Sequence, residues 1–427
     1  MLVVISLPDD SLPVAVIGAG PVGLAAAVHL LERGKRPLVL EAGPGAGASI
    51  REWGHVALFS PWRYDIDAAA RRLLEESGWA EPDLDRSPTG DELVRDYLEP
   101  LAATPRLAPH IRYGARVTAV MRAGVDKTRT LGRERRPLVV RVETETGVSD
   151  VRVEAVIDAS GTWATPNPIG ASGLAAPGEA EAAPWMLGPL PDVLGADRAR
   201  VAGRTTLVIG KGHSAANTLL SLVDLARDEP GTEVIWAIRG RSARRLFGGE
   251  NADELPERGA LGTRLREAVD AGLVRFERGF EVSRLEAVAD GRLDVIAADE
   301  AGERRLTVDA VAGATGFRPD LDMLREVRVD LDPALECPVR LAPLIDPTIH
   351  SCGTVEPHGA DVLSHPEEGL YVVGMKSYGR APTFLLATGY EQVRSVVAAI
   401  AGDAASASRV DLLLPATGVC CTDGAAC

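Results

Sequence analysis

Short apolar runs followed by glycine-rich turns recur in the two halves of the chain. Residues 14–17 (Val-Ala-Val-Ile) and 206–209 (Thr-Leu-Val-Ile) are typical of strands buried in a parallel sheet. Each run is followed by glycines, by a stretch with helical periodicity and by a second apolar run, at 38–40 and 233–238 respectively. The pattern predicts two βαβ units whose glycine turns lie about 190 residues apart.

The rest of the pattern alternates between helices and strands, which indicates the α/β class. Residues 164–200 are rich in proline and glycine and are interpreted as an irregular connection, and the tail after Gly402 as loosely ordered. The further elements are predicted as helices at 65–77, 91–101 and about 383–401, strands at 115–122, 138–143, 150–158 and 370–374, and a meander over 280–312.

Composition excludes several classes of partner. The formal net charge of −15 repels a phosphate backbone, and aromatic residues make up only 4% of the 427 residues, so no nucleic-acid partner is expected. No apolar run approaches the ~20 residues that span a bilayer, so no membrane partner is expected. The acidic Asp9-Asp10 pair follows the short apolar start, which argues against a signal peptide and favours a cytoplasmic location.

The first glycine turn has the spacing G-x-G-x-x-G, in Gly18-Ala19-Gly20-Pro21-Val22-Gly23. Glycines at these positions let the turn close and let backbone amides approach a pyrophosphate at the helix N-terminus. Glu41, at the end of the next strand, can accept hydrogen bonds from both ribose hydroxyls and disfavours a 2′-phosphate. The segment predicts a dinucleotide site, because a purely packing role for the glycines leaves Glu41 unexplained.

The second turn, Gly210-Lys211-Gly212-His213-Ser214-Ala215, has alanine in place of the third glycine. Its partner strand ends not in an acid but in Arg239-Gly240-Arg241. Guanidinium groups at this point favour a 2′-phosphate, so the segment predicts a site for a phosphorylated dinucleotide. A solvated basic turn is the alternative, and His213 is equally compatible with packing in the turn.

With both turns in place, the chain resembles the two-dinucleotide-binding-domain flavoproteins, which include flavin-containing monooxygenases and thioredoxin reductases. Residues 156–161 (Val-Ile-Asp-Ala-Ser-Gly) and 314–319 (Ala-Thr-Gly-Phe-Arg-Pro) resemble the two linkers of that superfamily, and 371–374 (Tyr-Val-Val-Gly) its late FAD-binding strand. The resemblance implies FAD on the first turn and NADPH on the second. It also implies two Rossmann-like domains, each a three-layer ββα structure, with the NAD(P)-binding domain inserted into the FAD-binding domain.

The resemblance assigns domains and further contacts to numbered residues of this chain. Met375 stands where such proteins often have an aspartate for the ribityl chain, and the helix after Pro382 would aim its dipole at the flavin pyrimidine ring. The implied domains are 1–165 and 311–404 for FAD, 198–310 for NAD(P)H, and 405–427 as a cysteine-containing tail. The further implied contacts are Ala42, Trp53, Val117, Ala159, Gly161, Gly374 and Met375 for FAD, and Thr315 and Gly316 for NADPH.

The residues around the implied flavin favour oxygen chemistry over dithiol chemistry. No C-x-x-C or C-x₄-C spacing occurs, and no cysteine precedes Cys337. The loop 44–63, with Gly47 before Trp53, resembles the flavin cover of flavin-containing monooxygenases, although the F-x-G-x-x-x-H fingerprint of Baeyer–Villiger enzymes is absent. The candidate catalytic residues, each with a packing or surface role as the alternative, are Lys376, Tyr378, Arg380 and His55.

Five cysteines lie in the last quarter of the chain. Cys420 and Cys421 are adjacent, and vicinal thiols near a terminus resemble the metal-handling tail of mercuric reductases, which selects soft species such as trivalent arsenic. Cys337 and Cys352 are further candidates, with burial as small hydrophobic residues as the alternative. Residues 374–383 together with this tail resemble flavoprotein monooxygenases of bacterial arsenic-resistance clusters, which implies a trivalent arsenical or another thiophilic substrate.

Three hypotheses follow. The first is an FAD- and NADPH-dependent monooxygenase acting with O₂ on a small soft substrate, as a possible homodimer. The second is an NADPH-dependent flavin reductase that passes electrons to a metalloid or disulfide held by the terminal cysteines. The third is a flavin-containing metalloid-binding or sensing protein.

Overall fold

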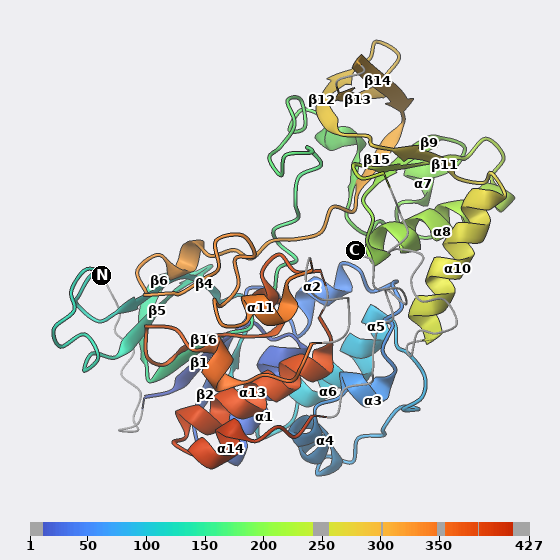
Figure 1. Cartoon of the computed structure of the whole chain (residues 1–427). Helices are drawn as coiled ribbons and strands as arrows, with labels where there is room; N and C mark the ends of the chain where they lie inside the picture. The colour runs from blue at the N-terminus through green and yellow to red at the C-terminus, as the bar shows by residue number, and fades with distance from the viewer. Residues whose placement is uncertain (1–11, 242–255, 300–301, 348–354, 383, 413–427) are drawn as a thin grey trace. The chain divides into compact units, whose positions relative to one another are not determined.

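A computed structural model describes residues 12–241, 256–299, 302–347, 355–382 and 384–412 (Figure 1). The described residues form two compact units, one up to Ala164 and from Arg318 onward, the other Thr165–Phe317. The second unit begins earlier than the predicted boundary at 198 and ends later than 310. Residues 165–197 therefore belong to the second unit, and they are largely irregular, as predicted, apart from two short elements over 183–188.

The first unit is built on a parallel sheet with the strand order β16-β7-β1-β2-β3. Val14 pairs with Pro37 on one side and with Ala155 on the other, so the strands start level and their carboxyl ends share one edge. The strands are β1 (Val14–Ile17), β2 (Pro37–Leu40), β3 (Ile111–Arg112), β7 (Ala155–Asp158) and β16 (Leu370–Val372).

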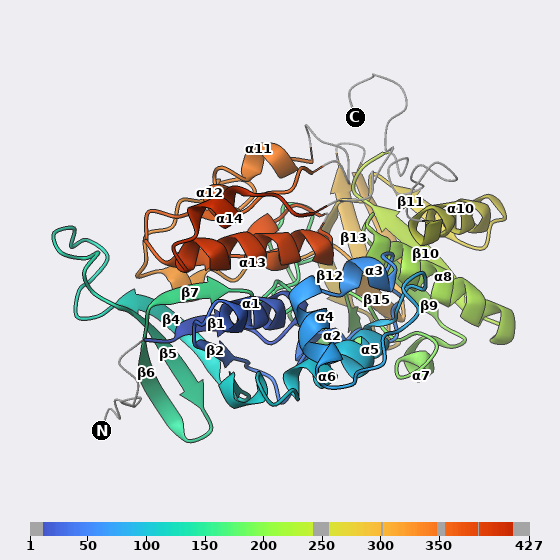
Figure 2. The same ribbon diagram turned by 90° about the horizontal axis from the view of Figure 1, so that it is seen from below.

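Alternate residues of this sheet serve two separate hydrophobic cores. Val14, Val16 and Ile157 pack under the helices α1 (Pro21–Glu32) and α13 (Leu386–Ile400), which lie against one another (Figure 2). Ala15, Ile17 and Val156 face the antiparallel sheet β4 (Arg116–Arg122), β5 (Leu138–Thr144) and β6 (Gly147–Val153). Burial on both faces explains why the strands are uniformly apolar. The layers are sheet, sheet and helix, as predicted.

The second unit repeats this layering. Its parallel sheet has the order β11-β10-β9-β15-β8, and residues such as Leu207 and Val311 pack against the antiparallel sheet β12-β13-β14. Helix α8 contacts β9 and β10 and also α10. The elements are β8 (Met186–Gly188), β9 (Thr205–Ile209), α8 (His213–Asp228), β10 (Glu233–Ile238), α10 (Pro256–Asp270), β11 (Arg275–Arg278), β12 (Val282–Ala287), β13 (Leu293–Asp299), β14 (Gly302–Val308) and β15 (Ala310–Gly313).

Several shorter helices of the first unit, among them α3 (Trp62–Asp65), α4 (Ala68–Glu75) and α12 (Ala360–Leu363), pack against α1 or α13. The predicted helix 65–77 is divided, because α3 ends at Asp65 and α4 begins after Asp67. The remaining helices are α2 (Ala48–Arg51), α5 (Gly90–Leu93), α6 (Glu99–Ala102), α7 (Arg198–Val201), α11 (Ala342–Ile345), the π-helical turn Val94–Leu98, and the 3-10 turns Ala108–His110, Ala183–Trp185, Asp322–Leu324 and Gly374–Tyr378.

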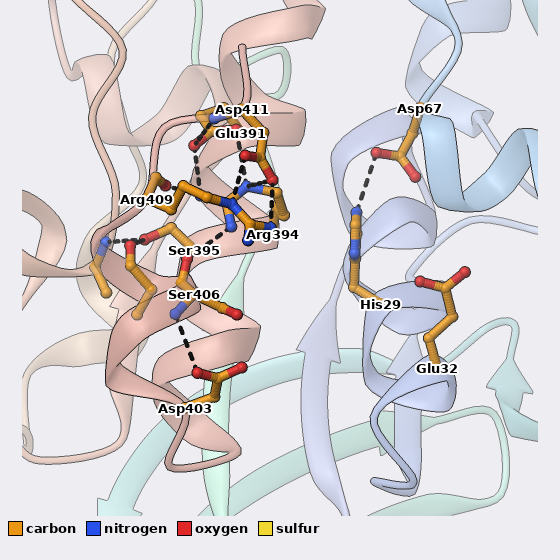
Figure 3. Close-up of polar contacts among 12 residues, drawn as sticks. His29, Glu32, Asp67, Glu391, Arg394, Ser395, Asp403, Ser406, Arg409 and Asp411 are labelled. Atoms are coloured by element: carbon orange, nitrogen blue, oxygen red, sulfur yellow. Dashed lines mark hydrogen bonds and ion pairs between the residues drawn. The ribbon is translucent and has the colours of Figure 1, made fainter.

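The start of the predicted tail is folded against α13. Helix α14 (Ala404–Ser408) is capped by Asp403, and Arg394 donates to the carbonyl oxygen of Ser406 at 2.8 Å while it pairs with the buried Glu391 (Figure 3). The expectation of a loosely ordered tail is therefore wrong for residues 403–412. Among the described residues, no helix combines the length and apolarity needed to cross a membrane.

Candidate functional site

The first glycine turn is shaped by close backbone contacts. Gly18 has φ +100°, and a Cβ there would lie 2.8 Å from the carbonyl oxygen of Ala159 at the end of β7. A Cβ on Gly23 would lie 2.1 Å from the carbonyl oxygen of Gly18. A Cβ on Gly20, by contrast, would meet nothing within 4 Å. Two glycines are thus required by the fold, and the middle one borders open space.

Helix α1 begins at this open space without a side-chain cap. Gly20 is its N-cap and Pro21 its first residue, and no side chain accepts a hydrogen bond from the first turn. The first backbone bond runs from Leu24 N to Gly20 O at 2.9 Å. The N–H groups of Val22 and Gly23 precede it, and an uncapped helix N-terminus of this kind binds anionic groups such as phosphate.

Glu41 is fixed at the carboxyl end of β2, beside the turn. Its Oε2 accepts from the N–H of Ala19 and its Oε1 from the N–H of Gly43, each at 2.7 Å. A carboxylate oxygen has a further lone pair, so both can still accept from ribose hydroxyls. Two further predicted FAD contacts differ in accessibility. Ala42 is exposed, whereas Val117 is buried in the core between the two sheets.

The second glycine turn has the same geometry in the other unit. Gly210 has φ +141°, and a Cβ there would lie 2.0 Å from the carbonyl oxygen of Ala314. Gly212 is the uncapped N-cap of α8 and borders open space, as Gly20 does. Ala215 is fully buried, so the methyl group that Gly23 could not carry is accommodated here. His213 and Ser214, in the first turn of α8, are half-buried.

Basic side chains occupy the position that Glu41 has in the first unit. Strand β10 ends at Ile238, and Arg239 and Arg241 follow with exposed side chains. Arg239 donates to the carbonyl oxygen of Ala171 at 3.2 Å. This position thus carries a carboxylate in one unit and guanidinium groups in the other, and the two favour different ribose substituents.

The predicted linker residues lie beside the glycine turns. Ala159 donates its N–H to Ile17 O at 3.0 Å, and Gly161 has φ +71° with open space around it. In the second unit Thr315 Oγ1 donates to Asn167 O at 2.6 Å, and Asn167 N donates to Gly316 O at 2.8 Å. The chain segments at the two ends of the second unit are therefore hydrogen bonded to each other.

The late strand reaches the first glycine turn through Gly374. A Cβ on Gly374 would lie 3.4 Å from the side chain of Val22, and one on Gly389, in the first turn of α13, 2.6 Å from it. Helices α1 and α13 therefore bring their N-termini together, and neither has a side-chain cap. Met375 is half-buried in the turn after Gly374.

Gln392 of α13 holds this late turn in place, and it was not predicted from the sequence. Its Oε1 accepts from Gly374 N at 2.7 Å, and its Nε2 lies 2.9 Å from His358 Nε2. His358 Nδ1 lies 2.9 Å from Glu356 O and must donate, so Nε2 of the neutral ring accepts. Burial lowers the pKa of His358, which agrees with this neutral form.

Lys376 is placed differently from the prediction of a charge at the cofactor. Its Nζ donates to Asp158 Oδ2 at 2.7 Å and to Ser160 Oγ at 3.0 Å, and both charged side chains are fully buried. This ion pair joins the end of β7 to the 3-10 turn that follows β16. A charged residue closing an otherwise apolar strand, as Asp158 does, was the available sequence signal for it.

The four candidate catalytic residues do not gather at one point in the described structure. Tyr378 is buried against Phe384, with ring centroids 5.1 Å apart. Arg380 is exposed near Glu336, and His55 is exposed in the loop before α3. The buried pairing of Lys376 favours a structural role for it.

The loop 44–63 is anchored on the first glycine turn. Gly47 donates its N–H to Ala19 O at 3.0 Å. Farther along, the rings of Trp53 and Trp163 lie 6.4 Å apart, and Trp163 Nε1 donates to Glu52 Oε2 at 2.8 Å. The predicted loop residue Trp53 therefore packs against Trp163, just after the first linker.

Cys337 is a buried core residue rather than a metal ligand. It is fully buried, and burial raises the pKa of its thiol to about 12, so it is not a thiolate at neutral pH. No group of three or more potential metal ligands occurs in the described parts of the chain. Cys352, Cys420 and Cys421 lie outside the described residues.

A buried polar cluster beside α13 was also not predicted from the sequence. Asp65 is fully buried and accepts from Ser60 Oγ at 2.6 Å, while its Oδ2 has no hydrogen-bond partner within the described structure. Burial raises the pKa of Asp65 to about 8, against the weaker opposing effect of the Ser60 hydrogen bond. Nothing in the spacing of the sequence marks this aspartate as buried.

Comparisons with known proteins agree with this geometry. A family model described as FAD dependent oxidoreductase matches residues 13–90, which hold the first βαβ unit. No curated protein matches the chain. Among solved structures, bacillithiol disulfide reductase from Bacillus cereus is 19% identical, with a TM-score of 0.67, covering 92% of this chain and 99% of its own.

Two monooxygenases are also similar. The cadaverine monooxygenase of desferrioxamine biosynthesis from Erwinia amylovora is 13% identical, with a TM-score of 0.64, covering 95% of this chain and 99% of its own. A mutant flavin monooxygenase from Stenotrophomonas maltophilia is 22% identical, with a TM-score of 0.58, covering 92% and 99%. The chain has the fold of the two-dinucleotide-binding-domain flavoproteins. The predicted fold class is confirmed, whereas membership of the superfamily and the resemblance to arsenic-resistance proteins stay predictions.

Replacing Asp65 should change how stability depends on pH in this flavoprotein fold. With a pKa raised to about 8, folded Asp65 keeps a proton that the unfolded chain loses near pH 4, so stability falls between these values. At pH 7 the raised pKa of Asp65 lowers the free energy of unfolding by on the order of 4 kcal/mol. We expect the free energy of unfolding of Asp65→Asn at pH 7 to exceed that of wild type by about 1–3 kcal/mol, which raises its urea midpoint. This gain should shrink toward pH 4.

Urea unfolding at several pH values checks this expectation. The matched control is Asp228→Asn, which removes an exposed carboxylate. A gain for Asp65→Asn that stays constant from pH 4 to pH 8 would contradict the raised pKa.

Proposed function

We propose that the chain is an NADPH-dependent flavoprotein monooxygenase that acts on a small, soft nucleophile. The observation that carries the proposal is the pair of glycine turns with equal geometry and opposite charges. Glu41 follows the first unit's second strand, and Arg239 and Arg241 follow the corresponding strand of the second unit. The chain thus offers one site for a dinucleotide with free ribose hydroxyls and another for one with a 2′-phosphate.

The first turn fits FAD. Gly20 leaves room for a diphosphate, the uncapped α1 supplies N–H groups and a positive dipole end, and Glu41 is held ready for the ribose. The family model that matches residues 13–90 describes FAD-dependent oxidoreductases, which supports this assignment. When bound, the flavin supplies hydride acceptance and electron transfer, and the chain binds and orients it.

The second turn fits NADPH by the same reasoning. Gly212 and the uncapped α8 provide the diphosphate position, and Arg239 and Arg241 provide cations for the 2′-phosphate. The net reaction is balanced. NADPH supplies two electrons, one atom of O₂ passes to the substrate, and the other leaves as water.

Dithiol chemistry is the less favoured alternative. The similar structures include a disulfide reductase as well as monooxygenases, so the fold does not decide between the two reactions. The sequence has no C-x-x-C or C-x₄-C pair, and the described Cys337 is buried with a raised pKa. Reduction of a metalloid or disulfide through Cys420 and Cys421 therefore stays the second hypothesis.

The substrate follows from the resemblance rather than from a contact in the structure. Soft, thiophilic compounds, including trivalent arsenicals, are the proposed class. A small-molecule partner together with O₂, a homodimer and a cytoplasmic location are likewise proposals.

Blocking the two diphosphate positions one at a time should separate the two cofactors. A Cβ added at Gly20 or at Gly212 meets nothing within 4 Å, and both positions have extended backbone, so stability should fall by only about 1 kcal/mol in Gly20→Val and Gly212→Val. We expect Gly20→Val to purify without flavin. Gly212→Val should keep flavin but lose its reduction by NADPH.

Flavin absorbance and anaerobic reduction measure these outcomes, and each variant controls for the other. Full flavin content in Gly20→Val would place the diphosphate elsewhere.

Removing the two arginines should alter nicotinamide preference. For the double variant Arg239→Ser and Arg241→Ser, we expect kcat/KM for NADPH to fall about 10- to 100-fold, because charge-assisted hydrogen bonds to the 2′-phosphate are lost. The value for NADH should change by less than about twofold. The matched control, Arg227→Ser, removes an exposed arginine at the far end of α8. Equal losses for both nucleotides would argue against a 2′-phosphate site.

Isotopically labelled O₂ distinguishes oxygenation from reduction. With NADPH and either a thioether or a trivalent organoarsenical, we expect label in the product and equal amounts of NADPH consumed and product formed. Replacing Cys420 and Cys421 by serine should leave this turnover unchanged. Unlabelled product with hydrogen peroxide as the only product of O₂, or loss of turnover in the serine variant, would favour the reductase hypothesis.

A further inference from the structure

The start of α13 is held from two opposite sides by buried hydrogen bonds. On one side Gln392 accepts from the N–H of Gly374. On the other, the hydroxyl of Tyr390 donates to the backbone carbonyl oxygen of Asp65 at 2.6 Å. The two residues are two positions apart, which separates them by roughly 200° around the helix. The first two turns of α13 are thus fixed in both directions across the helix axis.

The anchor at Tyr390 is the end of a directed chain of hydrogen bonds. The hydroxyls of Tyr390 and Tyr97 hydrogen bond to one another, and the N–H of Asp67 donates to the Tyr97 oxygen at 3.1 Å. Each phenol has one proton to donate. Because the Tyr390 hydroxyl donates to the backbone carbonyl oxygen of Asp65, the Tyr97 hydroxyl must be the donor in its hydrogen bond with Tyr390. All of these side chains are buried, so deleting one hydroxyl removes a hydrogen bond from each of its partners in the protein interior.

The N-terminus of α13, which these hydrogen bonds support, lies at the first glycine turn. Gly389 packs on Val22, in the first turn of α1, closely enough that a Cβ would lie 2.6 Å from it. Leu385, the N-cap of α13, provides no side-chain cap, so the positive end of the helix dipole is unscreened by the chain. Tyr390 is one turn into the helix, behind this end.

We propose that Tyr390 is a positioning residue, which fixes the N-terminus of α13 beside the bound flavin and thereby sets the flavin's reduction potential. The inference rests on the proposed function, since it requires FAD at the first glycine turn. Tyr390 is separated from that turn by the first residues of α13, so its effect passes through the helix. Loss of the Tyr390 hydroxyl would let the helix end move away and would weaken its stabilisation of negative charge on reduced flavin.

The test compares variants of the full chain purified with FAD. In Tyr390→Phe we expect the ratio of reduced to oxidised flavin, at a fixed reference potential, to fall about tenfold, which is about 30 mV for a two-electron couple. Tyr97→Phe should shift the ratio in the same direction, and the double variant should shift it by less than the sum of the two. The matched control is Val396→Ala, which destabilises the far half of α13 without touching the chain of hydroxyls.

The midpoint potential, the FAD content and the thermal midpoint are measured for each variant. A lowered potential in both tyrosine variants and an unchanged one in Val396→Ala, at similar thermal midpoints, supports the proposal. An unchanged or raised potential in Tyr390→Phe with full FAD content overturns it and leaves the proposed function intact. If Tyr390→Phe does not fold, an unchanged potential in Tyr97→Phe overturns it. A wild-type chain that binds no flavin overturns the proposed function and this inference together.

Discussion

The close approach of a glycine to the carbonyl oxygen at the end of a neighbouring strand is the contact on which both halves of the molecule depend. At Gly18 and at Gly210, a Cβ would lie within 2.8 Å of the oxygens of Ala159 and Ala314 respectively. Only glycine allows the turn to pass so close with positive φ. The contact brings the helix N-terminus over the carboxyl edge of the parallel sheet, where uncapped N–H groups favour an anionic ligand.

Around this contact, both units have the same three layers. They differ in the charge of the residue that follows the second strand of the βαβ unit. Local packing determines which residue occupies the third position of each motif. Gly23 packs directly on the carbonyl oxygen of Gly18, whereas the site of Ala215 has room for a methyl group. The residue after the second strand, by contrast, differs in charge between the units, and a carboxylate such as that of Glu41 and a guanidinium such as that of Arg239 favour different ribose substituents. Under the proposed function, the two units would bind two different dinucleotides and bring their chemistry into one protein.

Buried polar side chains hold the edge of the first unit in a fixed arrangement. Lys376 with Asp158 joins two strand ends, and Gln392 and Tyr390 fix α13 on opposite sides. Breaking a buried pair costs more than the pair contributes, because an unpaired charge or hydroxyl is left in the interior. Such residues specify position more than stability, which is what a site assembled from several strand and helix ends requires.

The sequence by itself determined the two βαβ units and the glycine turns, because these depend on local periodicity and on backbone conformations that few residues adopt. The layer architecture was predicted only through the resemblance to a known superfamily. It also located Glu41 and Arg239, which follow directly from strand ends. Tertiary structure alone decided that Lys376 is paired in the interior and that Asp65 and Tyr390 meet across 325 residues. Burial and pairing of polar groups depend on which distant segments pack together, and a local pattern carries no record of that packing.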